Sequence, residues 1–463
     1  MPIVVSAFYL IKKEWQSILL LFASYYFYMA WNPWFALLIL FSTVIDFSLA
    51  KLIAKNNNLF TKRSLLLISL FVNLGLLFYF KYTNFFLASL HNLLGHSGEF
   101  KALDIILPVG ISFYTFQTLS YTIDVYRGQK EVEDSFIKFS LYVSFFPQLV
   151  AGPIERSTHL LPQLEKFKYK HEDFIYGSKL IVWGFFKKLV IADRLAIYVN
   201  NTYSDVSSSS SLALIAATYF FSFQIFCDFS GYTDIARGIS RLFGVDLMHN
   251  FKRPYFASSI GEFWKRWHIS LSTWFRDYLY IPLGGSRTSQ ARWFLNILIV
   301  FLVSGLWHGA NWTFVIWGAL HALYFKVEKV LEIILPPKED KKASRIFKIF
   351  FTYHLTLFAW IFFRANDLKH ALNIIQKIIS DFKVSFPTLS NMILKFTFDN
   401  RSPSHFLLAV LTIAFLLIIQ GIQERKKLVN LTNRQQFIFY AFLIIMTILF
   451  GNYTESSFIY FQF

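Results

Sequence analysis

The chain contains 463 residues, of which 55% are hydrophobic and only 16% are charged, and its formal net charge at pH 7 is +17. Soluble globular domains contain about 25% charged residues, so a soluble fold of this composition would expose too much apolar surface. The composition excludes a soluble enzyme, a disordered scaffold and a disulfide-rich secreted domain, and it predicts an all-α, polytopic membrane protein. Cys227 is the only cysteine, which leaves no partner for an intramolecular disulfide.

Apolar segments of membrane-spanning length recur along the chain. A helix rises about 1.5 Å per residue and needs about 20 apolar residues to cross about 30 Å of hydrocarbon. We predict about eleven transmembrane helices within a single membrane-embedded domain that takes in residues 1–463. They cover residues 16–31, 34–50, 64–82, 105–126, 176–200, 211–236, 293–308, 311–327, 349–363, 405–421 and 436–451.

Two further apolar segments are predicted not to cross the bilayer. Residues 1–11 are too short to span it, and no convincing cleavage site follows them, so they are predicted to lie at the interface rather than to form a removable signal peptide. Residues 136–152 end in Phe146-Pro147-Gln148 and Ala151-Gly152-Pro153. Proline and glycine at these positions favour a re-entrant or broken helix.

Basic residues gather in loops on one side of the predicted helices. Residues 12–13, 51–63, 329–348 and 425–434 are rich in lysine and arginine, whereas 91–104, 201–210 and 452–463 contain only Lys101. The positive-inside rule therefore predicts that the N-terminus is cytoplasmic and that the C-terminus lies on the opposite side of the membrane. The loop 364–404 carries six Lys/Arg on the predicted outer side, but it is long and spreads them among acidic residues. The pattern favours membrane lipids as partners and argues against nucleic acid.

Residues 256–292 do not resemble a lipid-facing helix, because aromatic and charged side chains alternate densely along them. Trp264, His268 and Ser272 are spaced four residues apart, so they are predicted to share one face of a helix. The alternative is an amphipathic surface helix whose cations reach the lipid phosphates.

An ionisable residue interrupts the apolar segments at Trp307-His308-Gly309-Ala310-Asn311-Trp312. Such a residue is costly in a membrane and indicates a functional site. Burial would keep His308 neutral, as a general base requires, while Gly309 would allow backbone or substrate to approach closely. The alternative is a core histidine hydrogen-bonded to a neighbouring helix. His321 is predicted to be a packing or mouth residue, because a continuous helix would turn it about 220° away from His308.

Motifs for other chemistries are missing from the sequence. HExxH and CxxC are absent, and no carboxylate stands at ligand spacing from His308, so no metal is expected. The GxSxG, GxxxxGK[ST] and GxGxxG motifs are absent as well. A transporter or flippase without covalent chemistry remains the alternative to an enzyme, although the sequence shows one broken helix rather than a corresponding pair.

Several short motifs are spread along the chain. The motifs are Ala151-Gly152-Pro153-Ile154-Glu155-Arg156, Cys227-Asp228-Phe229-Ser230-Gly231-Tyr232-Thr233-Asp234, Phe263-Trp264-Lys265-Arg266-Trp267-His268, Ser270-Leu271-Ser272, Trp274-Phe275-Arg276-Asp277-Tyr278, Pro282-Leu283-Gly284-Gly285, Trp307-His308-Gly309-Ala310 and Phe458-Ile459-Tyr460-Phe461-Gln462-Phe463. Together they resemble the signature of the membrane-bound O-acyltransferases, most of all the branch that contains the bacterial alginate and peptidoglycan O-acetyltransferase subunits. The resemblance runs in family order from about residue 105 to the end, and the first hundred residues match only in hydropathy.

The resemblance implies that His308 is the family's near-invariant histidine and that His268 is its second one. It implies acyl transfer from a thioester, expected to be acetyl-CoA, through a tunnel between the leaflets. General-base help from His308 contributes about 10²–10⁴-fold, and His268 would orient the acceptor or hold the thioester oxygen. The resemblance also implies a bacterial inner membrane, with the C-terminus on the periplasmic side, and a separate periplasmic SGNH-type O-acetyltransferase as the partner.

Peptidoglycan is the predicted acceptor polysaccharide, and alginate is the alternative. The 56 phenylalanines, the many lysines and asparagines and the few methionines are typical of AT-rich coding, whereas alginate producers are associated with GC-rich genomes. D-alanine transfer to teichoic acids also remains open.

Two further sets of residues are candidates for binding and transfer. Five cations near the predicted inner mouth suit the phosphates of CoA, with lipid headgroups as the alternative: Lys252, Arg253, Lys265, Arg266 and Arg287. In the short aromatic tail, Tyr460 either anchors the last helix in an aromatic belt or, as tails in related O-acyltransferases imply, accepts the acetyl group and relays it.

Overall fold

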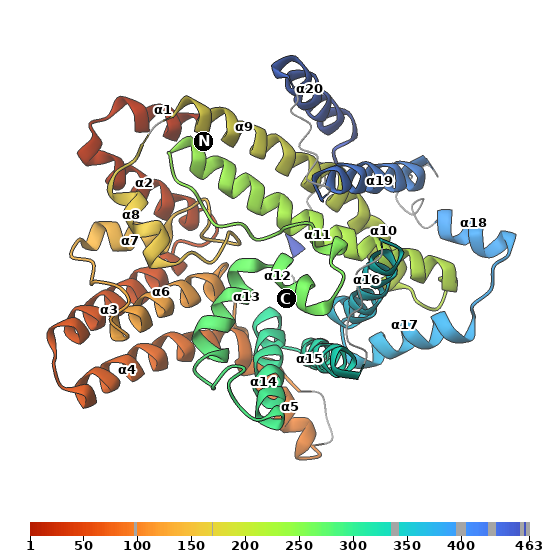
Figure 1. The fold of residues 1–463 in the computed structure, drawn as a ribbon, viewed down its shortest axis with the longest axis horizontal. Coiled ribbons are helices and arrows are strands. Elements are labelled where there is room, and N and C mark those ends of the chain that lie inside the picture. The colour runs from red at the N-terminus through yellow and green to blue at the C-terminus, as the bar shows by residue number, and fades with distance from the viewer. Residues whose placement is uncertain are drawn as a thin grey trace. The chain divides into compact units, whose positions relative to one another are not determined.

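The computed structural model of the protein describes residues 1–96, 100–168, 170–334, 342–394, 404–424, 432–453 and 458–459. Throughout these residues the secondary structure is helical, and none of them forms a strand (Figure 1). The predicted all-α fold is confirmed. The chain divides into two compact units, Met1–Ile181 with Thr233–His249, and Val182–Tyr232 with Asn250–Phe463. The helices α9 (His171–Phe185) and α11 (Ser211–Leu242) each contribute to both units.

The first unit contains the N-terminal helices. They are α1 (Pro2–Leu10), α2 (Lys13–Met29), α3 (Phe35–Lys55), α4 (Leu59–Leu77), the π-helix η1 (Phe78–Tyr82), α5 (Thr83–Leu93), α6 (Ile111–Tyr126), α7 (Phe136–Ser144), α8 (Ser157–Glu165) and most of α9 (His171–Phe185). Helix α1 is short, and the helix that begins at Phe136 breaks after Ser144. Both observations agree with the prediction that residues 1–11 and 136–152 do not form continuous spans. Within this unit α6 packs against α3 and α4, and Asp46 of α3 is buried with the Asn73 amide donating to it at 2.9 Å.

The second unit contains the remaining elements. They are the π-helix η2 (Phe186–Ala192), α10 (Asp193–Ser204), most of α11 (Ser211–Leu242), η3 (Pro254–Phe256), α12 (Ile260–Arg266), α13 (Ile269–Phe275), the π-helix η4 (Arg276–Tyr280), α14 (Gln290–His308), α15 (Trp312–Ile334), α16 (Lys342–Arg364), α17 (Leu368–Ser380), α18 (Phe386–Leu394), α19 (Ser404–Glu424) and α20 (Asn433–Phe450).

Seven helical segments in the described residues are long and apolar enough to cross a membrane. They are Phe35–Lys55, Leu59–Leu93, Ser211–Leu242, Gln290–His308, Ala343–Arg364, Ser404–Glu424 and Asn433–Phe450. Each coincides with a predicted span, and the other four predicted spans fall on α2, α6, the α9–η2–α10 segment and α15. The protein is therefore a multi-pass membrane protein.

Two glycines bring α14 and α15 together side by side (Figure 1). A Cβ atom on Gly305 would lie 2.2 Å from the Phe314 carbonyl oxygen, and a Cβ on Gly318 would lie 2.2 Å from the Phe301 carbonyl oxygen. No larger residue fits at either position without moving the partner backbone. This close contact fixes the C-terminal end of α14, where His308 lies.

Candidate active site

His308 is the last residue of α14, and its side chain is only 2% exposed. Its ring centroid lies 5.0 Å from that of Trp307, 5.1 Å from that of Trp317 and 5.3 Å from that of Phe363. The next residue is Gly309, and only glycine fits there because a Cβ atom would lie 2.1 Å from the Phe314 ring. The imidazole is therefore enclosed by aromatic side chains at the buried C-terminal end of α14.

His268 lies between α12 and α13 rather than within one helix. Its φ of 42° is in the left-handed region, which costs a non-glycine residue about 1–3 kcal/mol. Backbone bonds hold this turn, since the N–H of Ile269 donates to the Asn250 carbonyl at 2.9 Å and that of Ser272 to the His268 carbonyl at 2.9 Å. The prediction that Trp264, His268 and Ser272 share one helical face is wrong, because α12 ends at Arg266 and α13 begins at Ile269.

The structure brings the two predicted histidines together. The ring centroids of His268 and His308 are 6.3 Å apart, and Phe229 of α11 covers His268 at 4.7 Å. His268 is fully buried, and burial lowers its pKa to about 3. It is therefore neutral at physiological pH, with one N–H donor and one acceptor nitrogen on the ring. A buried, neutral imidazole of this kind can orient an acceptor or support a general base.

The segment 256–292 forms the short helices α12, α13 and η4 rather than one amphipathic surface helix, and residues 257–275 are buried or half-buried except for Lys265. Phe263, Trp267 and Leu271 are each 1% exposed. Trp267 packs against Trp360 of α16, with ring centroids 5.1 Å apart. The short helices α12 and α13 therefore form part of the protein interior that surrounds His268.

His321 is a packing residue, which is one of the two roles that the sequence predicted for it. Its ring is fully buried between those of Phe263 and Phe301, and its Nδ1 accepts a hydrogen bond from Trp264 Nε1 at 3.3 Å. The argument from a continuous helix does not apply, because the helix breaks between His308 and Trp312. Trp317 contacts both His308 and His321, at 5.1 Å and 4.9 Å between ring centroids.

A cavity of about 620 Å³ lies beside this aromatic cluster, lined by residues of α12 to α15 and η4. Trp264 and Phe301 form part of its apolar wall, and Ser304 lies one helical turn before His308 on the same face of α14. Charged side chains also line it: Glu262, Lys265, Arg276, Glu328, Lys329 and Glu332. The cavity thus combines an apolar wall near the histidines with charged groups suited to a polar ligand.

The five predicted cations fall into two kinds of environment. Lys252, Lys265 and Arg287 are exposed. Arg253 and Arg266 are instead paired internally with Glu424 of α19, at 2.7 Å and 2.8 Å. Glu262 also pairs with Arg266 at 2.6 Å and, with Glu424, raises the pKa of the guanidinium.

The backbone ties part of this group together, since the Lys252 N–H donates to the Arg266 carbonyl at 2.9 Å. Arg287 lies in the turn between η4 and α14. The exposed lysines and Arg287 are the members whose charges stay available to a phosphate.

Phe458 and Ile459, the last described residues of the C-terminal tail, lie close to His268 through a shared neighbour, Phe229. Phe458 contacts the rings of Phe229 and Tyr232, with centroids 6.0 Å and 5.2 Å away, and the Ile459 N–H donates to Asp228 at 2.7 Å. Phe458 and Ile459 are both buried. Tyr460 lies outside the described residues.

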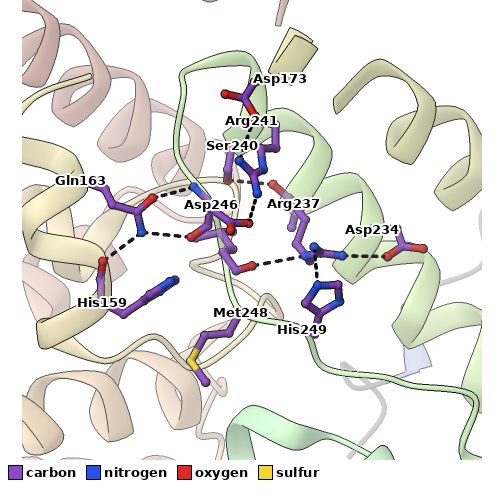
Figure 2. Close-up of polar contacts among 12 residues, drawn as sticks. His159, Gln163, Asp173, Asp234, Arg237, Ser240, Arg241, Asp246, Met248 and His249 are labelled. Carbon is purple, nitrogen blue, oxygen red and sulfur yellow. Dashed lines mark hydrogen bonds and ion pairs between the residues drawn. The ribbon is translucent and has the colours of Figure 1, made fainter. Parts of the chain in front are cut away.

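The resembling motif at residues 151–156 belongs to a polar network in the first unit. Glu155 is fully buried and binds the His159 ring and the Met248 N–H, at 2.7 Å and 2.6 Å. Arg241 pairs with Asp173 at 2.9 Å and with Asp246 at 2.7 Å (Figure 2). These contacts fasten the 243–249 segment to α8 and α11.

Sequence reasoning overlooked two lysines of η2, of which Lys187 is buried and Lys188 is half-buried, and it overlooked the role of Glu424. A signal existed for the first, because Lys187 and Lys188 stand inside a predicted span where cations are costly. No local signal marked Glu424, because its partners Arg345, Arg266 and Arg253 lie 79, 158 and 171 residues away. Among the described residues, no group of three or more His, Cys, Asp or Glu is arranged to hold a metal ion.

Residues 130–365 match the family model described as MBOAT, membrane-bound O-acyltransferase family. A probable alginate O-acetylase of Pseudomonas aeruginosa is 38% identical over 383 residues, which are 82% of this chain and 73% of that protein. A peptidoglycan O-acetyltransferase of Helicobacter pylori is 36% identical over 82% of this chain and 76% of its own length. A teichoic acid D-alanyltransferase of Bacillus subtilis is 28% identical over 58% of this chain and 71% of its own length.

Proposed function

The chain belongs to the membrane-bound O-acyltransferase family, and from that premise we propose that it moves acetyl groups from cytoplasmic acetyl-CoA across the bacterial inner membrane for O-acetylation of an extracytoplasmic polysaccharide. Family membership makes it an acyltransferase rather than a transporter without covalent chemistry. The observation that carries the proposal is the buried pair of histidines, 6.3 Å apart and enclosed by aromatic rings.

In the proposed reaction His308 accepts the proton of an acceptor hydroxyl. The acceptor oxygen attacks the thioester carbonyl, the C–S bond breaks as the O–C bond forms, and the CoA thiolate leaves with the proton returned by the His308 imidazolium. The products are an acetyl ester and free CoA. His268, whose neutral ring carries one N–H and one acceptor nitrogen, holds the acceptor or the carbonyl oxygen in place.

Moving only the acetyl group solves a problem of charge. CoA carries several phosphates, and carrying them through hydrocarbon would be very costly. We propose that the donor stays at the cytoplasmic side, where the exposed Lys252, Lys265 and Arg287 contact its phosphates. Lys265 also lines the 620 Å³ cavity, which gives it access to a ligand held there.

We further propose that Tyr460 is the acceptor that relays the acetyl group. Its two preceding residues are buried inside the protein rather than facing lipid, which supports a relay over an aromatic anchor. A phenol with a pKa near 10 is a better leaving group than a sugar hydroxyl, so its ester passes the acetyl group on readily. The receiver is a periplasmic SGNH-type O-acetyltransferase, which delivers it to the polysaccharide.

We propose peptidoglycan as the acceptor polysaccharide, on the AT-rich character of the composition. The similarity to a probable alginate O-acetylase favours alginate as the second candidate. Deletion of the gene, followed by measurement of ester-linked acetate on both polymers, distinguishes them. Loss from peptidoglycan supports the first proposal, loss from alginate alone selects the second, and loss from neither contradicts both.

A further inference from the structure

Two adjacent lysines of the π-helix η2 are directed into the protein. Lys187 is only 3% exposed, and its Nζ donates to Ser230 Oγ at 2.9 Å. The Lys188 Nζ lies 2.7 Å from Asp193 Oδ1 and 2.8 Å from Asp228 Oδ1. The two aspartates are buried and the Lys188 side chain is 20% exposed. Placing such a largely buried ion cluster among apolar helices is costly and does not by itself favour stability over well-packed apolar residues. This cluster therefore calls for a role beyond holding the helices together.

The local backbone explains how these groups meet. A Cβ atom on Gly231 of α11 would lie 2.9 Å from the Gly184 carbonyl oxygen and 3.3 Å from the Lys188 nitrogen. Glycine thus allows α11 to approach the start of η2 closely, and Asp228 and Ser230, which both precede Gly231 in α11, reach the lysines. Single-turn π segments of this kind are frequent at functional sites.

The two carboxylates of the cluster have different partners. One oxygen of Asp228 contacts Lys188, and the other accepts the backbone N–H of Ile459 at 2.7 Å. Asp193 pairs with the same lysine, and the bond to the Ile459 N–H comes from Asp228. Asp228 is therefore the residue that links the ion cluster to the C-terminal segment.

A second attachment holds the beginning of that segment. The Asn452 N–H donates to the Leu189 carbonyl of η2 at 2.9 Å, and its side-chain amide donates to the Asp193 carbonyl at 3.3 Å. The segment that follows α20 is thus held at residue 452 and again at residue 459. Both attachments involve η2 or the residues that pair with its lysines.

The attachment at residue 459 is adjacent to the active site along α11. Asp228 binds Ile459, and the next residue, Phe229, packs against His268 at 4.7 Å and against Phe458 at 6.0 Å. One turn of α11 therefore contacts both the histidine site and the C-terminal segment.

We propose that Asp228 is a positioning residue, which with Lys188 and Asp193 fixes the C-terminal segment beside His268 so that the end of the chain can accept the acetyl group. This inference rests on the proposed function, in which the tail is the acceptor. Asp228 acts through the tail and does not itself contact substrate.

The first test measures whether the tail is released. In an Ile459→Cys variant the new thiol sits at a position that is 1% exposed, and the natural Cys227 is fully buried and reports unfolding. We expect maleimide labelling of residue 459 to be slow, and to become about tenfold faster when Asp228→Ala is added, while Cys227 stays protected. Peptide mass spectrometry separates the two sites. Continued protection of residue 459 would overturn the proposal.

Two matched variants identify the contact responsible. Asp228→Asn keeps an oxygen for the Ile459 N–H and leaves Lys188 paired with Asp193, so the tail is expected to stay protected. Asp193→Asn also removes one negative charge beside Lys188, but it keeps the bond between Asp228 and the Ile459 N–H, so it should leave the tail protected as well. Equal release of the tail in Asp228→Ala and Asp228→Asn would show that the hydrogen bond is not what holds it.

The second test measures transfer in these variants without the cysteine change. Asp228→Ala is expected to reduce polysaccharide acetylation about tenfold or more with little change in the KM for acetyl-CoA, because the acceptor and not the donor is misplaced. Asp228→Asn should restore most of the transfer. Wild-type transfer with a released tail would overturn the positioning role and leave the proposed function intact, whereas retained transfer in His308→Ala would refute the proposed function itself.

Discussion

Two histidines in different regions of this molecule have opposite surroundings. In the first unit, a hydrogen bond of 2.7 Å joins Nδ1 of His159 to Oε2 of Glu155, and this bond raises the pKa of the histidine. In the second unit, aromatic rings enclose His268, and burial lowers its pKa to about 3. A carboxylate partner favours the charged imidazolium, whereas an apolar enclosure favours the neutral ring.

The difference distinguishes a structural contact at His159 from a site suited to chemistry at His268 and His308. Around His159 the carboxylates and arginines are paired with one another and secure the loop that follows α11 (Figure 2). Around His268 and His308 the neighbours are chiefly rings, which exclude water and leave polar chemistry to the imidazoles themselves. We therefore expect substitutions in the first region to affect stability and those in the second to affect transfer.

The largest effect is expected for His308→Ala. Loss of a general base should reduce polysaccharide acetylation by about 100-fold or more with the protein still inserted and folded. The matched control is His159→Ala, which should keep most of the acetylation. If His308→Ala retains more than about a tenth of wild-type acetylation, a base contributing at this level is ruled out.

His268 should give the next largest effect. His268→Asn keeps a residue type that tolerates the left-handed backbone, and His268→Gly removes the strain altogether. Both are expected to lose acetylation by about tenfold or more, because the ring is missing while the turn is preserved. Normal activity in His268→Gly would mean that the position matters only for its backbone.

Charge reversal at the two neighbouring cations should have different consequences. Lys265→Glu is expected to raise the KM for acetyl-CoA about threefold to tenfold, with a smaller increase at high salt because exposed charges are screened. Arg266→Glu would place a third carboxylate beside Glu262 and Glu424, so reduced thermal stability should accompany any change in KM. An unchanged KM with poorer membrane insertion in Lys265→Glu would favour a lipid-headgroup role.

The smallest effect is an opposite dependence of stability on pH in the two regions. The folded-state pKa of His268 lies below its unfolded value, so stability is lost as the pH falls below about 6.5, by up to about 1.4 kcal/mol for each unit. The pKa of His159 is raised, so its stabilising contribution is present at low pH and is lost as the pH rises through the folded value.

Thermal unfolding in detergent between about pH 5 and about pH 8 measures both contributions. His268→Asn should flatten the loss of stability on the acid side. His159→Gln should differ most from the wild type at the acid end and approach it at the alkaline end. Parallel curves for the two variants would contradict the difference between the regions.

The helical architecture could be predicted because apolar length is a local property, and the seven apolar helices coincide with predicted spans. The break at His268 could not, because a four-residue spacing fits a continuous helix equally well. Contacts with Asn250 and burial of Trp267 decide the turn instead. The pairing of Arg266 with Glu424 was likewise invisible to local patterns, since it joins residues 158 positions apart.

Acetyl transfer at the histidine pair can be tested by the reaction of the purified protein with acetyl-CoA labelled in the acetyl group. We predict that the wild type releases CoA and yields an acetylated peptide containing Tyr460, which mass spectrometry detects. His308→Ala should show neither CoA release nor the acetylated peptide. Tyr460→Phe, which keeps the ring, should lose both the labelled peptide and the acetylation of polysaccharide. Binding of acetyl-CoA by the wild type without release of CoA, or equal release by His308→Ala, would contradict acetyl transfer at the histidine pair.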